Sequence, residues 1–253
     1  MPTAILARLV LLEARRGALP WLAGGGLAAA LLIAAFLSQV ALTEARPLQL
    51  AVLAALLRAG AVFLVAVQVS ASVIREIDDK GLELTLSLPL PRASHYLGRL
   101  AGHGAVAAAL ALVFALPLLV WAGPGAMAFW ATSLALEGVL VASAAFFFAM
   151  TLAQPVAAIA ATAGLYLLAR SMAAIQAIAA GPLVDPSPAS QAARFCVDAV
   201  ALLLPRLDAV TRSDWLLYGT PGAAGFAAAM GVLLVYTALL AAAGLFDFYR
   251  RSA

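Results

Sequence analysis

The chain has 253 residues, of which 65% are hydrophobic and only 11% are charged, and its mean hydropathy is +1.05. Soluble domains contain roughly 45–50% apolar residues, so this composition excludes an ordinary soluble fold and predicts one all-α integral membrane domain over residues 1–253. The net charge of +3 is dispersed among hydrophobic runs and the chain has one cysteine, so we expect no nucleic-acid partner, no internal disulfide and no cysteine-based metal site.

The first 17 residues have an amphipathic pattern. Three apolar residues fall on one side of a helix and three arginines fall largely elsewhere: Ile5, Leu9 and Leu12, against Arg8, Arg15 and Arg16. This pattern predicts an N-terminal interfacial helix over 1–17, with a cytoplasmic extension of the first span as an equal alternative. The apolar run that follows is longer than the roughly 7–15 residues of a signal-peptide core, so we interpret it as a retained span.

Charge-free runs predict six transmembrane helices. Helix breakers separate several of them, including "AGPGA" after the third and Gln154–Pro155 after the fourth. Arg58 is expected to limit the second span, leaving 44–56 as an interfacial segment. The predicted spans are 19–41, 57–74, 100–121, 127–151, 156–179 and 226–246.

An even number of spans places both termini on one side. The N-terminal segment, the 75–99 window and the C-terminal tail together hold nine of the 15 Lys and Arg residues. The excess of positive charge favours the cytoplasm for these three segments. We therefore expect a multi-pass protein of a cytoplasmic (inner) membrane with cytoplasmic termini.

Charge is concentrated in the window 75–99, "REIDDKGLELTLSLPLPRASHYLGR". Its pattern predicts a short amphipathic helix bent near Gly81, a break at Pro89 and Pro91, and a new helix that becomes the third span. Gly98 and Gly102 form a small-xxx-small pair that suits close helix packing. Such an elbow would offer a rigid, charged contact to a cytoplasmic protein; an ordinary solvated loop is the alternative.

Sequence motifs for catalysis are absent. The only lysine is Lys80, so the chain has no Gly-Lys-Ser/Thr phosphate-binding loop, and His95 and His103 lie too far apart in sequence for a metal motif. We expect a non-enzymatic chain with no metal and no cofactor of its own.

The window also resembles a known family. Seven residues match the signature that follows the second span of ABC-2 type transporter permeases: Gly81, Glu83, Leu86, Pro89, Arg92, Gly98 and Arg99. The layout is similar too, because that family has an interfacial N-terminal helix, six spans, a cytoplasmic coupling helix and a long external segment between spans 5 and 6. Leu82 and Arg99 stand where the family often has Thr and Lys.

The resemblance implies a transmembrane subunit that works with a separate ABC ATPase, which would carry ATP and Mg. The partners would be that ATPase, a second permease copy or a sibling permease, and membrane lipid, and the direction would be export. The coupling loop would span 75–92, and its contacts with the ATPase would be Arg75, Glu76, Asp78, Asp79, Gly81, Glu83, Pro89 and Arg92. Cytochrome c or copper-enzyme maturation permeases, and a membrane scaffold that transports nothing, are the alternatives.

Two charged residues lie deep inside predicted spans. Glu137 is about 15 Å into the fourth span and Arg170 is at similar depth in the fifth, at 1.5 Å per helical residue. Because an unpaired charge in hydrocarbon is costly, we expect them to form a pair, with a role in the transport path as the alternative.

The segment 181–225 mixes prolines, charges and apolar clusters. It is expected to be a long external connection with one or two short amphipathic helices. These helices would either cap the pathway or contact an extracytoplasmic partner, or they would lie on the outer leaflet, with Trp215 and Tyr218 as interfacial anchors.

Overall fold

The computed structural model describes residues 2–40, 45–80, 91–181, 187–219 and 222–251, and every regular element in these ranges is a helix. Six helical stretches are long and apolar enough to cross a membrane, as predicted: Leu19–Val40, Arg46–Asp78, Arg92–Val120, Pro124–Leu152, Pro155–Ala179 and Ala223–Arg250. The chain is therefore a helical protein with the architecture of a multi-pass membrane protein.

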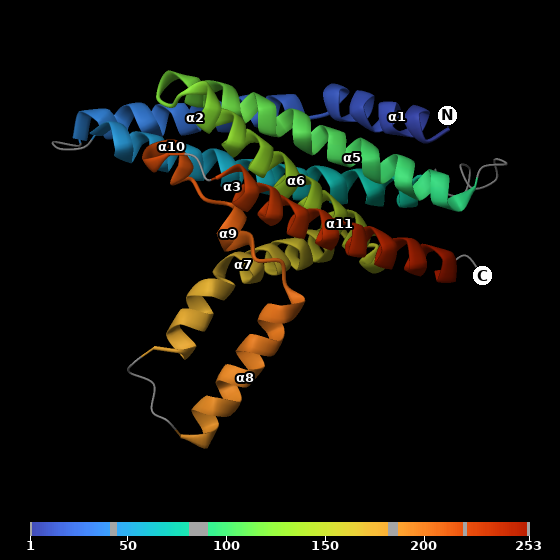
Figure 1. Ribbon diagram of the computed structural model, residues 1–253. Coiled ribbons are helices and arrows are strands. Elements are labelled where there is room, and N and C mark those ends of the chain that lie inside the picture. The colour runs from blue at the N-terminus through green and yellow to red at the C-terminus, as the bar shows by residue number, and fades with distance from the viewer. Residues whose placement is uncertain (1, 41–44, 81–90, 182–186, 220–221, 252–253) are drawn as a thin grey trace.

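Most of the long helices lie side by side along roughly one direction (Figure 1). α1 (Pro2–Arg16) leads into α2 (Leu19–Val40), and these are followed by α3 (Ala45–Asp78), α5 (Arg92–Ala115), the short 3₁₀ helix η1 (Leu116–Val120), α6 (Pro124–Leu152), α7 (Pro155–Ala179) and α11 (Ala223–Arg251). α1 begins and α11 ends at the same end of the bundle (Figure 1).

α6 lies at the centre and packs against α3, α5, α7 and α11. Its buried face contains many small residues, among them Gly138, Ala142, Ser143 and Ala145. Small side chains let helix backbones approach closely, and packing of this kind is what holds helices together in lipid. α6 therefore provides the surface on which the other spans assemble.

Proline residues mark both ends of α6, as the sequence predicts. The helix begins at Pro124, where the missing N–H costs no intrahelical hydrogen bond, after an extended Gly123. It ends at Leu152, with Ala153 in the left-handed conformation (φ 51°), and α7 begins at Pro155. The breaks predicted at "AGPGA" and at Gln154–Pro155 are confirmed.

The close packing predicted for Gly98 and Gly102 is also confirmed, and its partner is α1. A Cβ atom added at Gly102 would lie 2.7 Å from the Cβ of Val10, and one added at Gly98 would lie 3.0 Å from the Cα of Thr3. α1 therefore lies along α5 and is in line with α2 (Figure 1).

α3 differs from the sequence-based expectation. It is one helix of 34 residues, so the expected interfacial segment at 44–56 is wrong for the described part, where Leu50, Leu53 and Ala54 are buried in the core. Arg58 does not end the span, because its charge has a buried partner within the bundle. Arg75 to Asp78 continue the same helix and do not form a separate one.

The described residues between α7 and α11 contain three further helices: α8 (Pro188–Leu203), α9 (Leu207–Val210) and α10 (Trp215–Tyr218). The outer part of α7 and α8 project from the bundle as a hairpin, whereas α9 and α10 return to it (Figure 1). The expected role of Trp215 as an interfacial anchor is wrong, because its ring is buried edge-on against Phe226 at 5.5 Å. Tyr218 is exposed.

Candidate functional site: a polar cluster inside the helix bundle

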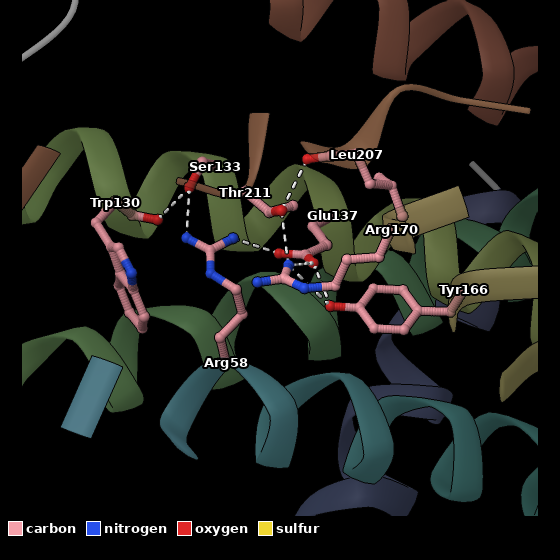
Figure 2. Close-up of polar contacts among 8 residues, drawn as sticks. All are labelled: Arg58, Trp130, Ser133, Glu137, Tyr166, Arg170, Leu207 and Thr211. Carbon is pink, nitrogen blue, oxygen red and sulfur yellow. Dashed lines mark hydrogen bonds and ion pairs between the residues drawn. The ribbon is translucent and has the colours of Figure 1, made fainter. Parts of the chain in front are cut away.

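A group of polar side chains lies in the middle of the bundle, and we call it the central polar cluster: Arg58, Trp130, Ser133, Glu137, Tyr166, Arg170 and Thr211 (Figure 2). α3, α6 and α7 contribute to it, and Thr211 follows α9. Glu137 is 13 residues from the start of α6, or about 20 Å of helix, so the cluster is far from either end of the span.

The core of the cluster is an ion pair between Arg58 of α3 and Glu137 of α6. Both side chains are fully enclosed, with exposed fractions of 1% and 0%. The other terminal nitrogen of Arg58 donates to the Ser133 hydroxyl at 3.0 Å, and the guanidinium lies 5.0 Å from the centre of the Trp130 ring. A cation over an indole face gains electrostatic stabilisation, so both α6 residues help to hold the arginine.

α7 and the α9 region complete the cluster on its other side. The Tyr166 hydroxyl donates to the second carboxylate oxygen of Glu137 at 2.7 Å. Arg170 Nη1 lies 3.7 Å from that same oxygen and donates to the Thr211 hydroxyl at 2.6 Å. Thr211 in turn donates to the carbonyl of Leu207 at 2.7 Å, so a segment far along the chain is tied to the intramembrane charges.

The cluster holds two guanidiniums and one carboxylate. A charged side chain at the centre of a bilayer costs at least about 2.5 kcal/mol, which explains why each carboxylate oxygen of Glu137 accepts a hydrogen bond. Arg170 differs from Arg58, because its side chain is 39% exposed. Glu137 therefore has one enclosed cationic partner and one accessible cationic partner.

A small apolar cavity adjoins the cluster. It has a volume of about 80 Å³ and lies between α6, α7, the α8–α9 connection and α11. Tyr166 lines this cavity and also bonds to Glu137. The tyrosine therefore separates an apolar space from the charges.

A second polar group lies at the end of the bundle where α3 ends. Arg99 of α5 pairs with Glu76 of α3, and His95 is 4.0 Å from the same carboxylate group. Glu13 of α1 accepts a hydrogen bond from Ser72 at 2.8 Å and lies 3.5 Å from Arg75. These contacts tie α1 and α5 to the last turns of α3.

The structure thus places the predicted site residues in different settings. Glu137 and Arg170 do lie within ion-pair distance, but the enclosed partner of Glu137 is Arg58.

Among the predicted contacts for an ATPase, Asp78 and Asp79 are exposed, whereas Glu76 is largely enclosed by its internal pair. Arg75 pairs with Glu13, and Arg92 begins α5. Gly81, Glu83 and Pro89 lie outside the described residues.

Five members of the cluster were not predicted from the sequence: Arg58, Trp130, Ser133, Tyr166 and Thr211. Arg58 was visible as the one charge between Arg46 and Arg75 in a mostly apolar run, and the default for such a charge is a buried partner. Tyr166 stands one helical turn before Arg170, which is the spacing of neighbours on one helix face. Nothing in the sequence marks Thr211.

Removal of the Tyr166 hydroxyl tests its contribution to the cluster. We expect Tyr166→Phe to lower the free energy of unfolding by about 1.5–3 kcal/mol, the range for a hydrogen bond to a charged group, because the Glu137 oxygen loses its neutral donor. Thermal unfolding of the purified protein measures this. Tyr218→Phe is the matched control, since that side chain is 85% exposed, and it should change stability by less than about 0.5 kcal/mol. Equal effects of the two changes would contradict the assignment.

Comparison with known proteins gives no family: no protein-family model matches the chain, and no curated protein matches it significantly.

Proposed function

We propose that this chain is the membrane-spanning subunit of an ATP-driven transporter of the ABC-2 type, an exporter of a bacterial-type inner membrane. It would pair with a second copy or a sibling permease. A separate ATPase subunit would bind ATP and Mg and dock on the 75–92 segment at the cytoplasmic face. The chain itself would form the path and transmit force, without catalysing a reaction.

The observation that supports the proposal best is the continuity of α3. This helix ends next to the segment that resembles the ABC-2 signature, where Asp78 and Asp79 are exposed, and it also carries Arg58 in the central polar cluster. Arg58 and Asp78 are 20 positions apart, or about 30 Å of helix. A packed helix transmits displacement along its length. Docking of the ATPase at the Asp78 end of α3 would therefore displace Arg58 relative to Glu137.

A displacement of α3 would change the contacts within the central polar cluster. Glu137 on α6 is shared between Arg58 on α3 and Arg170 on α7. A shift of α3 relative to α6 would alter the balance between these two partners. A carboxylate with two cationic partners can favour one or the other, which gives the helices two discrete arrangements.

Charge reversal at the end of α3 tests the proposed docking. We expect the tagged full-length chain, purified in mild detergent from its native membrane, to recover a P-loop ATPase. Asp78→Lys combined with Asp79→Lys should reduce that recovery at least tenfold while the melting temperature is unchanged, because both side chains are exposed. Glu83→Ala with Arg92→Ala tests the signature residues in the same way.

Asp198→Lys on α8 is the control, since it reverses an exposed acidic charge away from the end of α3. It should leave recovery intact. If no ATPase is recovered, or if all variants recover it equally, the permease proposal fails and the non-transporting scaffold becomes the better interpretation.

A further inference from the structure

A groove between α1, α2 and α5 has two distinct ends. Its volume is about 580 Å³, within the roughly 300–1,000 Å³ typical of ligand pockets. One end is formed by α1 and includes Arg8 and Arg15. The other end is formed by α2 and α5 and is lined by apolar residues or glycine, among them Ala23, Leu27 and Val113. The groove is thus amphipathic along its length.

The two arginines are available to a ligand in the part of the chain that the structure describes. Neither Arg8 nor Arg15 makes a hydrogen bond or an ion pair with any residue in the described part of the chain, and both are exposed. The nearest acidic side chain in sequence, Glu13, is already engaged by Ser72 and Arg75. Two cations seven positions apart on one helix therefore face the groove with no counterion among the described residues.

The position of the groove matches that of a membrane interface. Trp21, at the start of α2, is 86% exposed, and exposed tryptophans next to a span are typical of the headgroup level. From Arg15 to Leu27 the α1–α2 stretch covers 12 positions, or about 18 Å, close to the roughly 15 Å of one leaflet of the hydrocarbon core. The charged end would thus meet headgroups while the apolar end meets acyl chains.

The structure assigns this groove to an anionic phospholipid, with the lipid phosphate between Arg8 and Arg15 and one acyl chain along α2 and α5. Basic pockets between membrane helices bind anionic headgroups in this way. The occupant would stabilise the contact of α1 with the bundle, since it would touch α1, α2 and α5 together. This inference does not depend on the proposed ATPase.

Native mass spectrometry of the purified full-length chain, titrated with phosphatidylglycerol and with phosphatidylcholine, tests the charged end. We expect phosphatidylglycerol to bind at least tenfold more tightly. Arg8→Gln with Arg15→Gln should remove that preference, a loss of roughly 10- to 30-fold for two basic contacts. Arg16→Gln with Arg194→Gln removes the same charge from residues that do not line the groove, and it should keep the preference.

Two neighbouring glycines test the apolar end. Gly24 lines the groove and Gly25 does not, and a Cβ added at either has nothing within 4 Å. Gly24→Leu should therefore fill the groove and weaken phosphatidylglycerol binding at least fivefold, whereas Gly25→Leu should not. The melting temperature of each variant without lipid checks that the bundle is intact.

Three results would overturn the assignment. The first is equal binding of the two lipids. The second is an equal loss of the phosphatidylglycerol preference in the Arg8/Arg15 double variant and in its control double variant. The third is equal binding by Gly24→Leu and Gly25→Leu. If glycerol phosphate without acyl chains competes as strongly as the intact lipid does, the site is one for a free phosphate and the acyl-chain part of the proposal is wrong.

Discussion

Glu137→Gln is expected to lower the melting temperature of the purified protein by roughly 6–20 °C. The change leaves Arg58 charged and enclosed without a counterion, since its side chain is only 1% exposed. Breaking a buried pair by removing one partner costs about 3–5 kcal/mol. For a chain of this size each kcal/mol corresponds to about 2–4 °C.

A second variant separates loss of the pair from loss of packing. Arg58→Met combined with Glu137→Gln removes the stranded cation, so the double variant should melt at a higher temperature than Glu137→Gln alone. Asp198→Asn is the control, because its pair with Arg194 is more than half exposed and such pairs contribute at most about 1 kcal/mol. If the loss of melting temperature in the double variant equals the sum of the losses in the two single variants, a direct Arg58–Glu137 interaction is contradicted.

The second large effect concerns the contact of α1 with α5. Gly102→Ala would place a Cβ 2.7 Å from Val10 Cβ and 3.0 Å from the backbone of Ala7, so α1 must move away. Overpacking of this kind costs about 1–3 kcal/mol, or roughly 2–12 °C in melting temperature. The loss should appear although alanine is the better helix former by about 1 kcal/mol.

Gly104→Ala is the matched control on the same helix. A Cβ there would lie 3.6 Å from the nearest atom of Val139, an ordinary contact, so the variant should be at least as stable as the parent. Gly98→Ala, with its closest approach at 3.0 Å, should fall between the two. A Gly104→Ala variant that melts below Gly102→Ala would show that α1 does not pack on α5 as described.

Much of the fold was predictable because hydrophobic length and helix breakers are local signals. The six apolar helices, the start of α6 at Pro124 and that of α7 at Pro155 all follow from such signals. The Gly98–Gly102 pair also predicted close packing, although its spacing alone did not identify α1 as the neighbour.

The central polar cluster was only partly predictable, for a physical reason. Glu137 and Arg170 stand on helices consecutive in the chain, so their proximity follows from short connections. Arg58 and Glu137 are 79 positions apart, and hydropathy does not reveal which helices are neighbours in the membrane. Thr211 reaches Arg170 only because α9 returns to the bundle, a tertiary feature with no local signal.

We propose that α3 links a docked ATPase to the central polar cluster. The most direct test of this link is the ¹⁹F NMR spectrum of the chain with its four tryptophans replaced by 5-fluorotryptophan, in complex with the ATPase that it recovers. Trp130 is fully buried beside Arg58, and its resonance is assigned with Trp130→Phe. Trp21 is the internal reference because it lies exposed on α2.

We predict that the Trp130 resonance differs between the ADP-bound and ATP-bound complexes, that Trp21 stays unchanged, and that Asp78→Lys with Asp79→Lys abolishes the difference. A Trp130 resonance that is identical in both nucleotide states, in a complex that hydrolyses ATP, would contradict the claim.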